Sequence, residues 1–164
     1  MPVSAANHYS LVLDNAATLF ANSSTFQTLM GVGSAAAAKA LIYWCETDET
    51  VSAESTLPRA IVDFRERQAR TNKEGTTTFT GTGPVVLRIE YATAQTTRQD
   101  AIKDCLNKAG AIQEEVLALT TGGGQYLNAV EIDLDGFGRL SMPENNANNA
   151  YLIMFVVSWV GMHT

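Results

Sequence analysis

The spacing of the apolar residues changes twice in the second half of the chain, and this change constrains the fold more than any other feature. Apolar residues occupy alternate positions from Val85 to Tyr91 and from Val130 to Leu134, which is the pattern of strands with one buried face. From Gln99 to Leu119 they recur every three or four positions, as one face of a helix requires. A buried strand is also expected from Tyr151 to Val160. We therefore expect an α+β fold, in which a mostly antiparallel sheet carries a long helix on one face.

The N-terminal part is expected to be helical and to lead into the sheet. Helical spacing of apolar residues predicts a helix from Tyr9 to Phe20, and Ser24 is the expected cap of a short helix over Thr25–Met30. An alanine-rich helical turn from Ala35 to Ala40 follows, and then a short apolar strand from Leu41 to Cys45.

The middle of the chain is expected to add one strand from Arg59 to Ala69. The Thr- and Gly-rich stretch Thr71–Gly83 suits a flexible hairpin tip, and Gly136–Asn149 is a polar loop. No repeat or linker divides the sequence, so residues 1–164 are expected to form one domain whose first 40 or so residues are helical. The expected core of the sheet consists of alternating apolar residues: Ile61, Phe64, Leu87, Ile89, Ile132, Leu134, Ile153, Phe155 and Val157.

Composition narrows the classes of function. Apolar residues make up 46% of the chain and charged residues 17%, as in folded proteins. The net charge of −6 opposes attraction to nucleic-acid backbones and to anionic lipid surfaces, and no apolar run approaches the roughly 18 residues that span a membrane. Cys45 and Cys105 have no metal or redox spacing, so buried free thiols and synthesis in a reducing cytoplasm are expected.

No catalytic, cofactor-binding or metal-binding constellation is expected. Gly31 and Gly33 imitate a dinucleotide-binding turn, but a helix and not a strand is predicted before them. Asp133 and Asp135 imitate a calcium loop, but the remaining ligands of such a loop are absent. The two histidines lie near the two ends of the sequence, where a general base or zinc site is hard to build. The chain is therefore expected not to be an enzyme.

Charge is segregated along the chain. Five of the eleven basic residues fall between positions 59 and 73, so this segment carries a net charge of +3 and the remainder carries −9. One interpretation is an ordinary strand face of mixed charge. The other is a self-association surface, on which a basic patch meets an acidic patch of the next copy. The candidate interaction residues are Arg59, Arg65, Arg67, Arg70 and Lys73 on the basic side, and Glu131 and Asp133 on the acidic side.

Three segments carry a resemblance to a known family. They are FQTLMGVGSAAAAKALIYWCETDE over residues 26–49, LPRAIVDF over 57–64 and NNAYLIMFVVSWV over 148–160. With the helix between them and the order of elements, the sequence resembles the tail terminator or tail completion proteins of long-tailed bacteriophages, and the likeness covers most of the chain.

The resemblance implies a structural virion protein at the head-proximal end of the tail. Such a subunit forms a ring, commonly of six copies, that caps the tail tube, joins it to the head–tail connector or neck proteins, and lets DNA pass through its bore without specific binding. No family motif places a binding residue here, so the interaction residues above rest on charge alone. Another neck protein of the head-closure or adaptor kind, a small divergent phage-encoded enzyme, and a monomeric ligand-binding domain are the alternatives.

Overall fold

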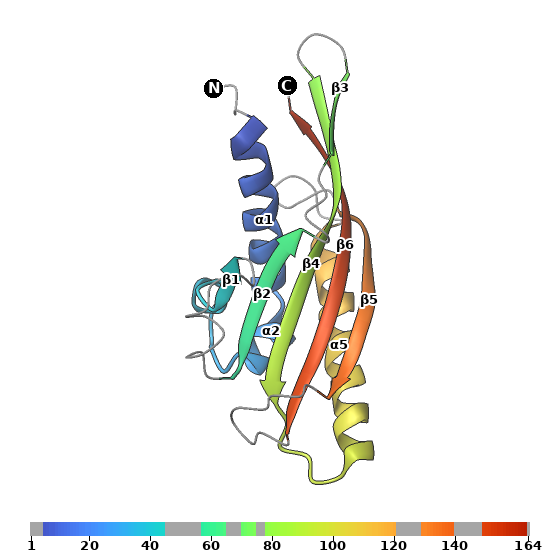
Figure 1. Cartoon of the computed structure of the whole chain (residues 1–164). Helices are drawn as coiled ribbons and strands as arrows, with labels where there is room; N and C mark the ends of the chain where they lie inside the picture. Colours follow the sequence, from blue (N-terminus) through green and yellow to red (C-terminus); the bar gives the residue numbers. More distant parts are fainter. Residues whose placement is uncertain are drawn as a thin grey trace.

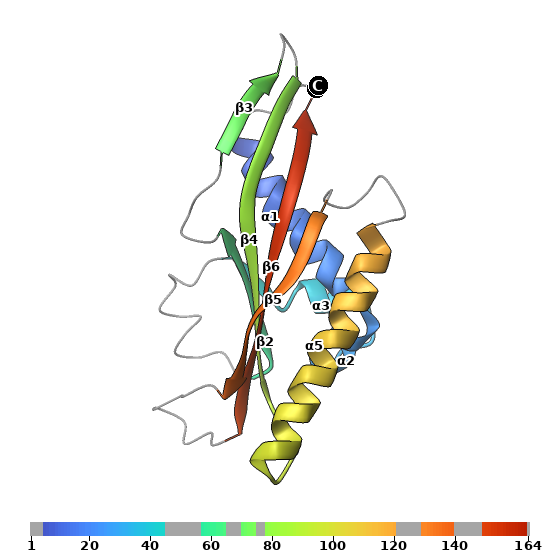
Figure 2. The same cartoon turned by 90° about the vertical axis from the view of Figure 1, so that its right-hand side faces the viewer.

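A computed structural model describes residues 5–44, 57–64, 70–74, 78–120, 129–139 and 149–163. These residues form two layers, a sheet and a set of helices that lie on one side of it (Figures 1 and 2). The expected α+β class, with a mostly antiparallel sheet and a long helix on one face, is confirmed.

Three helices precede the sheet: α1 (Ala5–Ala21), α2 (Ser24–Leu29) and α3 (Ala35–Lys39). All three were expected, but the cap of α2 is Ser23 and not Ser24. Ser23 has extended backbone angles, and its hydroxyl accepts a hydrogen bond from the amide of Phe26, as an N-cap residue should.

The strands form one sheet in the order β1-β2-β4-β6-β5, with β3 paired to β4 beyond the end of β2. Strand β1 runs parallel to β2, and all other described pairs are antiparallel. The bounds are β1 Ile42–Trp44, β2 Arg59–Phe64, β3 Arg70–Glu74, β4 Thr78–Ala92, β5 Ala129–Arg139 and β6 Ala150–His163.

Two expected loops are wrong in part. Within Thr71–Gly83, β3 pairs with the beginning of β4, so this stretch is largely a hairpin of two strands. The threonines explain the difference, because β-branched residues favour strands even beside glycines. Strand β5 continues to Arg139, four residues into the expected loop Gly136–Asn149. The middle of each loop lies outside the described residues, as do the end of the expected strand Arg59–Ala69 and residues 45–56.

Proline separates the two partners on one side of β4. Strand β2 ends opposite Val85, and β3 begins opposite Thr82, so the interruption lies at Gly83 and Pro84. Because proline has no amide hydrogen, it cannot donate to a ladder. Beyond this point β3, β4 and β6 continue as a narrow extension past the body of the sheet (Figure 1).

The long helix α5 (Arg98–Thr120) lies across the sheet and closes the core. Thr97 caps it, since its hydroxyl accepts from the Asp100 amide at 3.1 Å and donates to the Asp100 carboxylate at 2.7 Å. Between the layers, the ring centroids of Phe20 and Phe155 are 5.4 Å apart.

Most of the expected sheet core is confirmed. The fully or almost fully buried members are Leu87, Ile89, Ile132, Ile153, Phe155 and Val157. Phe64 and Leu134 are only partly buried against this core. Ile61 is buried, but it is not part of the cluster between sheet and helices.

Candidate interaction surface

The sheet has a second face, here called the outer face, that points away from the helices. On β4, Leu87 and Ile89 belong to the helix-facing core, so the residues between them, such as Arg88, point to the other side. The ladder then defines the outer face across the neighbouring strands: Arg59, Ile61 and Asp63 on β2, Val86, Arg88 and Glu90 on β4, Leu152, Met154 and Val156 on β6, and Asp133 on β5.

A cluster of charged residues lies within this face. The carboxylate of Glu90, whose side chain is 1% exposed, accepts hydrogen bonds from the Nε atoms of Arg59 and Arg88 at 2.5 Å each. The Arg59 side chain is 8% exposed, and that of Arg88 is 28% exposed. A buried carboxylate requires partners of opposite charge, because burial removes it from water. The two arginines supply them.

Glu90 and Arg88 were not among the residues predicted from the sequence, because the alternation from Val85 to Tyr91 predicts burial of the opposite face alone. Alternation of apolar residues along a strand shows which residues share a face, but it does not show whether the other face is exposed to solvent. The available signal was the occurrence of opposite charges two positions apart on one strand, since such residues lie on the same face.

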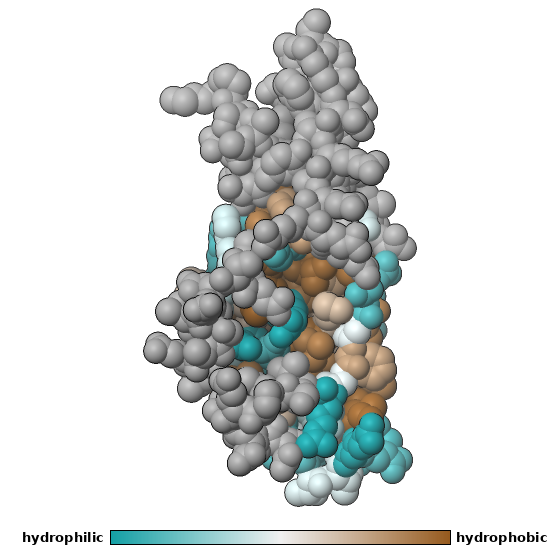
Figure 3. Space-filling model, in the orientation of Figure 1, coloured by the Kyte–Doolittle hydropathy of each residue, from teal (hydrophilic) through white to brown (hydrophobic). Residues whose placement is uncertain are grey.

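Apolar side chains surround the cluster. Val86, Leu152 and Met154 are half-buried, and Val156 is buried. In Figure 3, which looks onto this face, brown apolar surface occupies the centre and teal polar residues lie beside it. No helix among the described residues covers this side of the sheet (Figure 2). The outer face is therefore more apolar than an ordinary solvated sheet face.

Strand β5 forms an acidic border along the outer face. It is the last strand of the sheet, and Asp133 and Asp135 on it are exposed. Asp133 lies opposite Val156, and Glu131 lies opposite Ser158. A register shift between Leu134 and Gly136 accommodates Asp135. Within the described part of the chain, the Asp133 side chain has no hydrogen bond or ion pair.

The expected basic strand is divided by the structure. Arg59 is buried and paired with Glu90 of the same chain, so it contributes little exposed charge to a basic surface. Arg70 and Lys73 lie on β3, apart from Arg59 on β2. Arg65 and Arg67 lie outside the described residues. The interaction role proposed for these residues remains a prediction.

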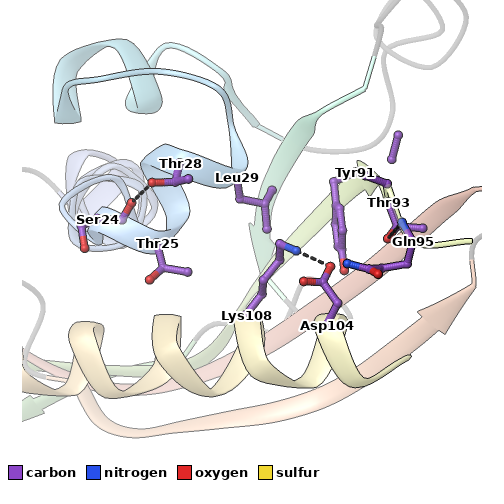
Figure 4. Close-up of a pocket in the computed structure, with 11 residues that line it drawn as sticks. Ser24, Thr25, Thr28, Leu29, Tyr91, Thr93, Gln95, Asp104 and Lys108 are labelled. Atoms are coloured by element: carbon purple, nitrogen blue, oxygen red, sulfur yellow. Dashed lines mark hydrogen bonds and ion pairs between the residues drawn. The ribbon is translucent and has the colours of Figure 1, made fainter. Parts of the chain in front are cut away.

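A hollow of about 380 Å³ lies between α2, the end of β4 and α5 (Figure 4). Lys108 forms an ion pair with Asp104, and its ammonium nitrogen lies 5.4 Å from the centroid of the Tyr91 ring. On the opposite wall, the Thr28 hydroxyl donates to the carbonyl of Ser24 at 3.0 Å. Lys108, Asp104 and Thr28 are thus bonded within the chain, whereas the buried Tyr91 hydroxyl has no hydrogen-bond partner among the described residues.

Tyr91 in the hollow and its neighbour Cys105 both have raised pKa values, so neither is ionised at neutral pH. Burial, followed by the neighbouring Cys105 thiol, raises the pKa of Tyr91 beyond its usual range. Burial also raises the pKa of Cys105, which is a free, buried thiol as expected. Since a reactive cysteine needs a stabilised thiolate, Cys105 does not resemble a nucleophile. Cys45 lies outside the described residues.

A carboxylate on α5 holds the start of α2. Glu115 accepts hydrogen bonds from the hydroxyls of Ser23, Ser24 and Thr25 at 2.7, 3.0 and 2.6 Å, and from the Thr25 amide at 3.0 Å. Burial alone would raise the pKa of Glu115, but the bonds from Thr25, Ser23 and Ser24 outweigh it and lower the pKa to about 2. The arrangement joins two helices and leaves no free donor pair for a ligand, so we interpret it as structural.

Within the described ranges, no three His, Cys, Asp or Glu residues converge as metal ligands would, and no helix has the length and apolar character needed to cross a membrane. No protein-family model matches the chain, and no curated protein shows significant similarity to it. The geometry of the outer face and the resemblance in the sequence are therefore the features that bear on function.

Proposed function

We propose that the chain is a ring-forming tail terminator or tail completion subunit of a long-tailed bacteriophage, which caps the tail tube and joins it to the head–tail connector. One observation carries the proposal: the outer face is apolar and has an acidic border on β5, while its arginines lie on β2 and β4. Opposite charges at different sides of one face make that face complementary to a second copy, either in a head-to-tail contact or about a two-fold axis. A head-to-tail contact that closes on itself forms a ring.

The apolar part of the face supports association more than the charges do. An exposed ion pair contributes only about 0 to 1 kcal/mol, so charges fix the register of a contact and exclude wrong partners. Stable association requires on the order of 800 Å² of buried surface on each partner, with an apolar centre. Val86, Leu152 and Met154 are half-buried in the single chain and would become fully buried in such a contact.

Two further features agree with a structural role in a tail. The extension formed by β3, β4 and β6 projects past the body of the sheet, where it can reach a neighbouring subunit or the tail tube (Figures 1 and 2). The net charge of −6 favours a bore to which DNA does not adhere during passage. On this proposal the protein is made in the host cytoplasm and ends in the virion.

Binding to tail tubes tests the role. Purified tubes that lack a terminator are mixed with the gold-labelled chain and examined by negative-stain electron microscopy. The proposal predicts a ring of label at one end of each tube. Binding to isolated connectors but not to tubes would contradict the terminator role and would favour a head-closure or adaptor protein.

A further inference from the structure

Arg88 is the member of the buried charged cluster that reaches the surface. The Glu90 side chain is 1% exposed and that of Arg59 is 8% exposed, whereas Arg88 retains 28%. Its guanidinium thus lies at the border between the cluster and solvent, surrounded by the half-buried Met154 and Val86. Arginine in such a setting, partly desolvated and ringed by apolar side chains, is typical of the energetic centre of an interface.

Asp133 is an exposed carboxylate on the same outer face. It has no bonding partner among the described residues, and β6 separates it from Arg88, because Asp133 lies opposite Val156 and Arg88 lies opposite Met154. Adjacent strands are about 4.8 Å apart, and two positions along a strand span about 7 Å, so the Cα atoms of these residues are roughly 12 Å apart. No ion pair joins the two side chains within one chain.

The other acids of this face are less suited to meet an arginine from outside. Glu90 is enclosed by Arg59 and Arg88. On β2, Asp63 accepts a hydrogen bond from the amide of Phe64 at 2.7 Å. Asp135 lies at the register shift of β5 and has further contacts of its own. Among the acids of this face whose side chains the structure describes, Asp133 is the one that remains.

Only certain symmetries bring these two residues together. To pair the two residues, β5 of one copy must lie over β4 of the other. A head-to-tail rotation achieves this once per contact, and it generates a ring if the rotation closes and an open filament if it does not. A two-fold axis that lies between the two residues in the plane of the face forms the Asp133–Arg88 pair twice and generates a closed dimer.

We infer that Asp133 of one copy forms an ion pair with Arg88 of a second copy and that this pair sets the register of the subunit contact. The inference rests on the proposed ring function, and it replaces Arg59 with Arg88 as the basic partner of the acidic border.

A double-mutant cycle tests the pair. The association constant of the full chain is measured by analytical ultracentrifugation for wild type, Asp133→Asn, Arg88→Gln and the double variant. We expect each single change to weaken association about tenfold and the second change to add little to the first. Arg88→Gln also removes a partner of Glu90, so its thermal stability is measured separately. Loss of stability alone cannot produce coupling to Asp133, since Asp133 has no described contact with the cluster.

Asp133→Lys and Glu114→Lys form a matched pair of charge reversals that does not touch the cluster. Glu114 is exposed on α5, on the helical side of the molecule, and has no described bonding partner. We expect Asp133→Lys to reduce the association constant at least tenfold and Glu114→Lys to leave it within about twofold of wild type. Equal effects of both variants, or additive effects in the cycle, would overturn the inference.

The outcome separates the pair from the proposed function. If the wild-type chain forms rings that Asp133→Lys leaves intact, the pair is wrong and the ring function stands. A wild-type dimer in which Asp133 and Arg88 are coupled would confirm the pair and contradict the ring. A chain that remains monomeric at the highest concentration, both free and on tail tubes, would overturn both.

Discussion

Replacing Glu115 by Gln is expected to lower the free energy of unfolding at pH 7 and to have much less effect near pH 2. Glu115 on α5 accepts four hydrogen bonds from Ser23, Ser24 and Thr25 at the start of α2. A neutral amide accepts such bonds more weakly than a carboxylate, and its NH₂ group cannot accept the bonds that the Ser24 and Thr25 hydroxyls donate to the second carboxylate oxygen.

The magnitude follows from the pKa. These bonds lower the pKa of Glu115 from an ordinary value of 4.5 to about 2. At about 1.4 kcal/mol per pKa unit this corresponds to roughly 3.5 kcal/mol at most. Because the carboxylate is partly exposed and screened by water, about 1 to 2 kcal/mol is expected.

The pH dependence has a definite sign. A carboxylate with a lowered pKa in the folded state contributes its full stability above the pKa of the unfolded state, here near 4.5. That contribution is lost as the pH falls toward 2, where the folded state is also protonated. The difference between wild type and Glu115→Gln should therefore shrink across this window.

Urea unfolding at pH 7, 4.5 and 2.5, followed by circular dichroism, measures the effect. Glu114→Gln is the control, because it makes the same chemical change at the adjacent, exposed position. A difference of 1 to 2 kcal/mol that is independent of pH, or an equal loss in Glu114→Gln, would refute the assignment of the stabilisation to the Glu115 carboxylate.

Three other substitutions follow from burial, each measured by urea or thermal unfolding. Glu90→Gln removes the charge that balances two arginines on the outer face, and it should cost about 3 to 5 kcal/mol; a loss below 1 kcal/mol would contradict a buried ion cluster. Phe155→Ala removes a fully buried ring and should also cost about 3 to 5 kcal/mol, whereas Phe137→Ala, with Phe137 47% exposed, should cost far less. Tyr91→Phe removes a buried hydroxyl that has no hydrogen-bond partner among the described residues, so stability should stay the same or rise; a loss above 1 kcal/mol would reveal a missing partner.

The elements that the sequence predicted well are those with long, regular spacing of apolar residues. Helix α5 and the second half of β4 have unambiguous periods, and the expected helix over Gln99–Leu119 differs from α5 by one residue at each end. Strand β6 was predicted from its continuous apolar run. The hairpin of β3 and β4 was missed because its threonines and glycines fit both a strand and a flexible tip, and only pairing across the ladder decides between them.

The candidate site was harder to predict because it depends on contacts between distant segments. Arg59 and Glu90 lie on neighbouring strands but are 31 positions apart in the sequence, and no local pattern links them. The charge pattern identified Arg59 and Asp133 as candidates. It could not show that Arg59 forms a buried ion pair with Glu90 while Asp133 is exposed. The distribution of charge along a sequence shows where a charged surface can form. Burial in the folded chain then determines which of its residues are accessible to a second protein.

Native mass spectrometry of the purified chain tests the central claim, self-association into a closed ring, most directly. The account predicts one dominant species at a small fixed multiple of the 17.6 kDa chain mass, roughly six copies if the tail-terminator resemblance holds, which persists on dilution as a closed ring should. A monomer at every concentration, or a series of masses that grows without limit, would contradict it.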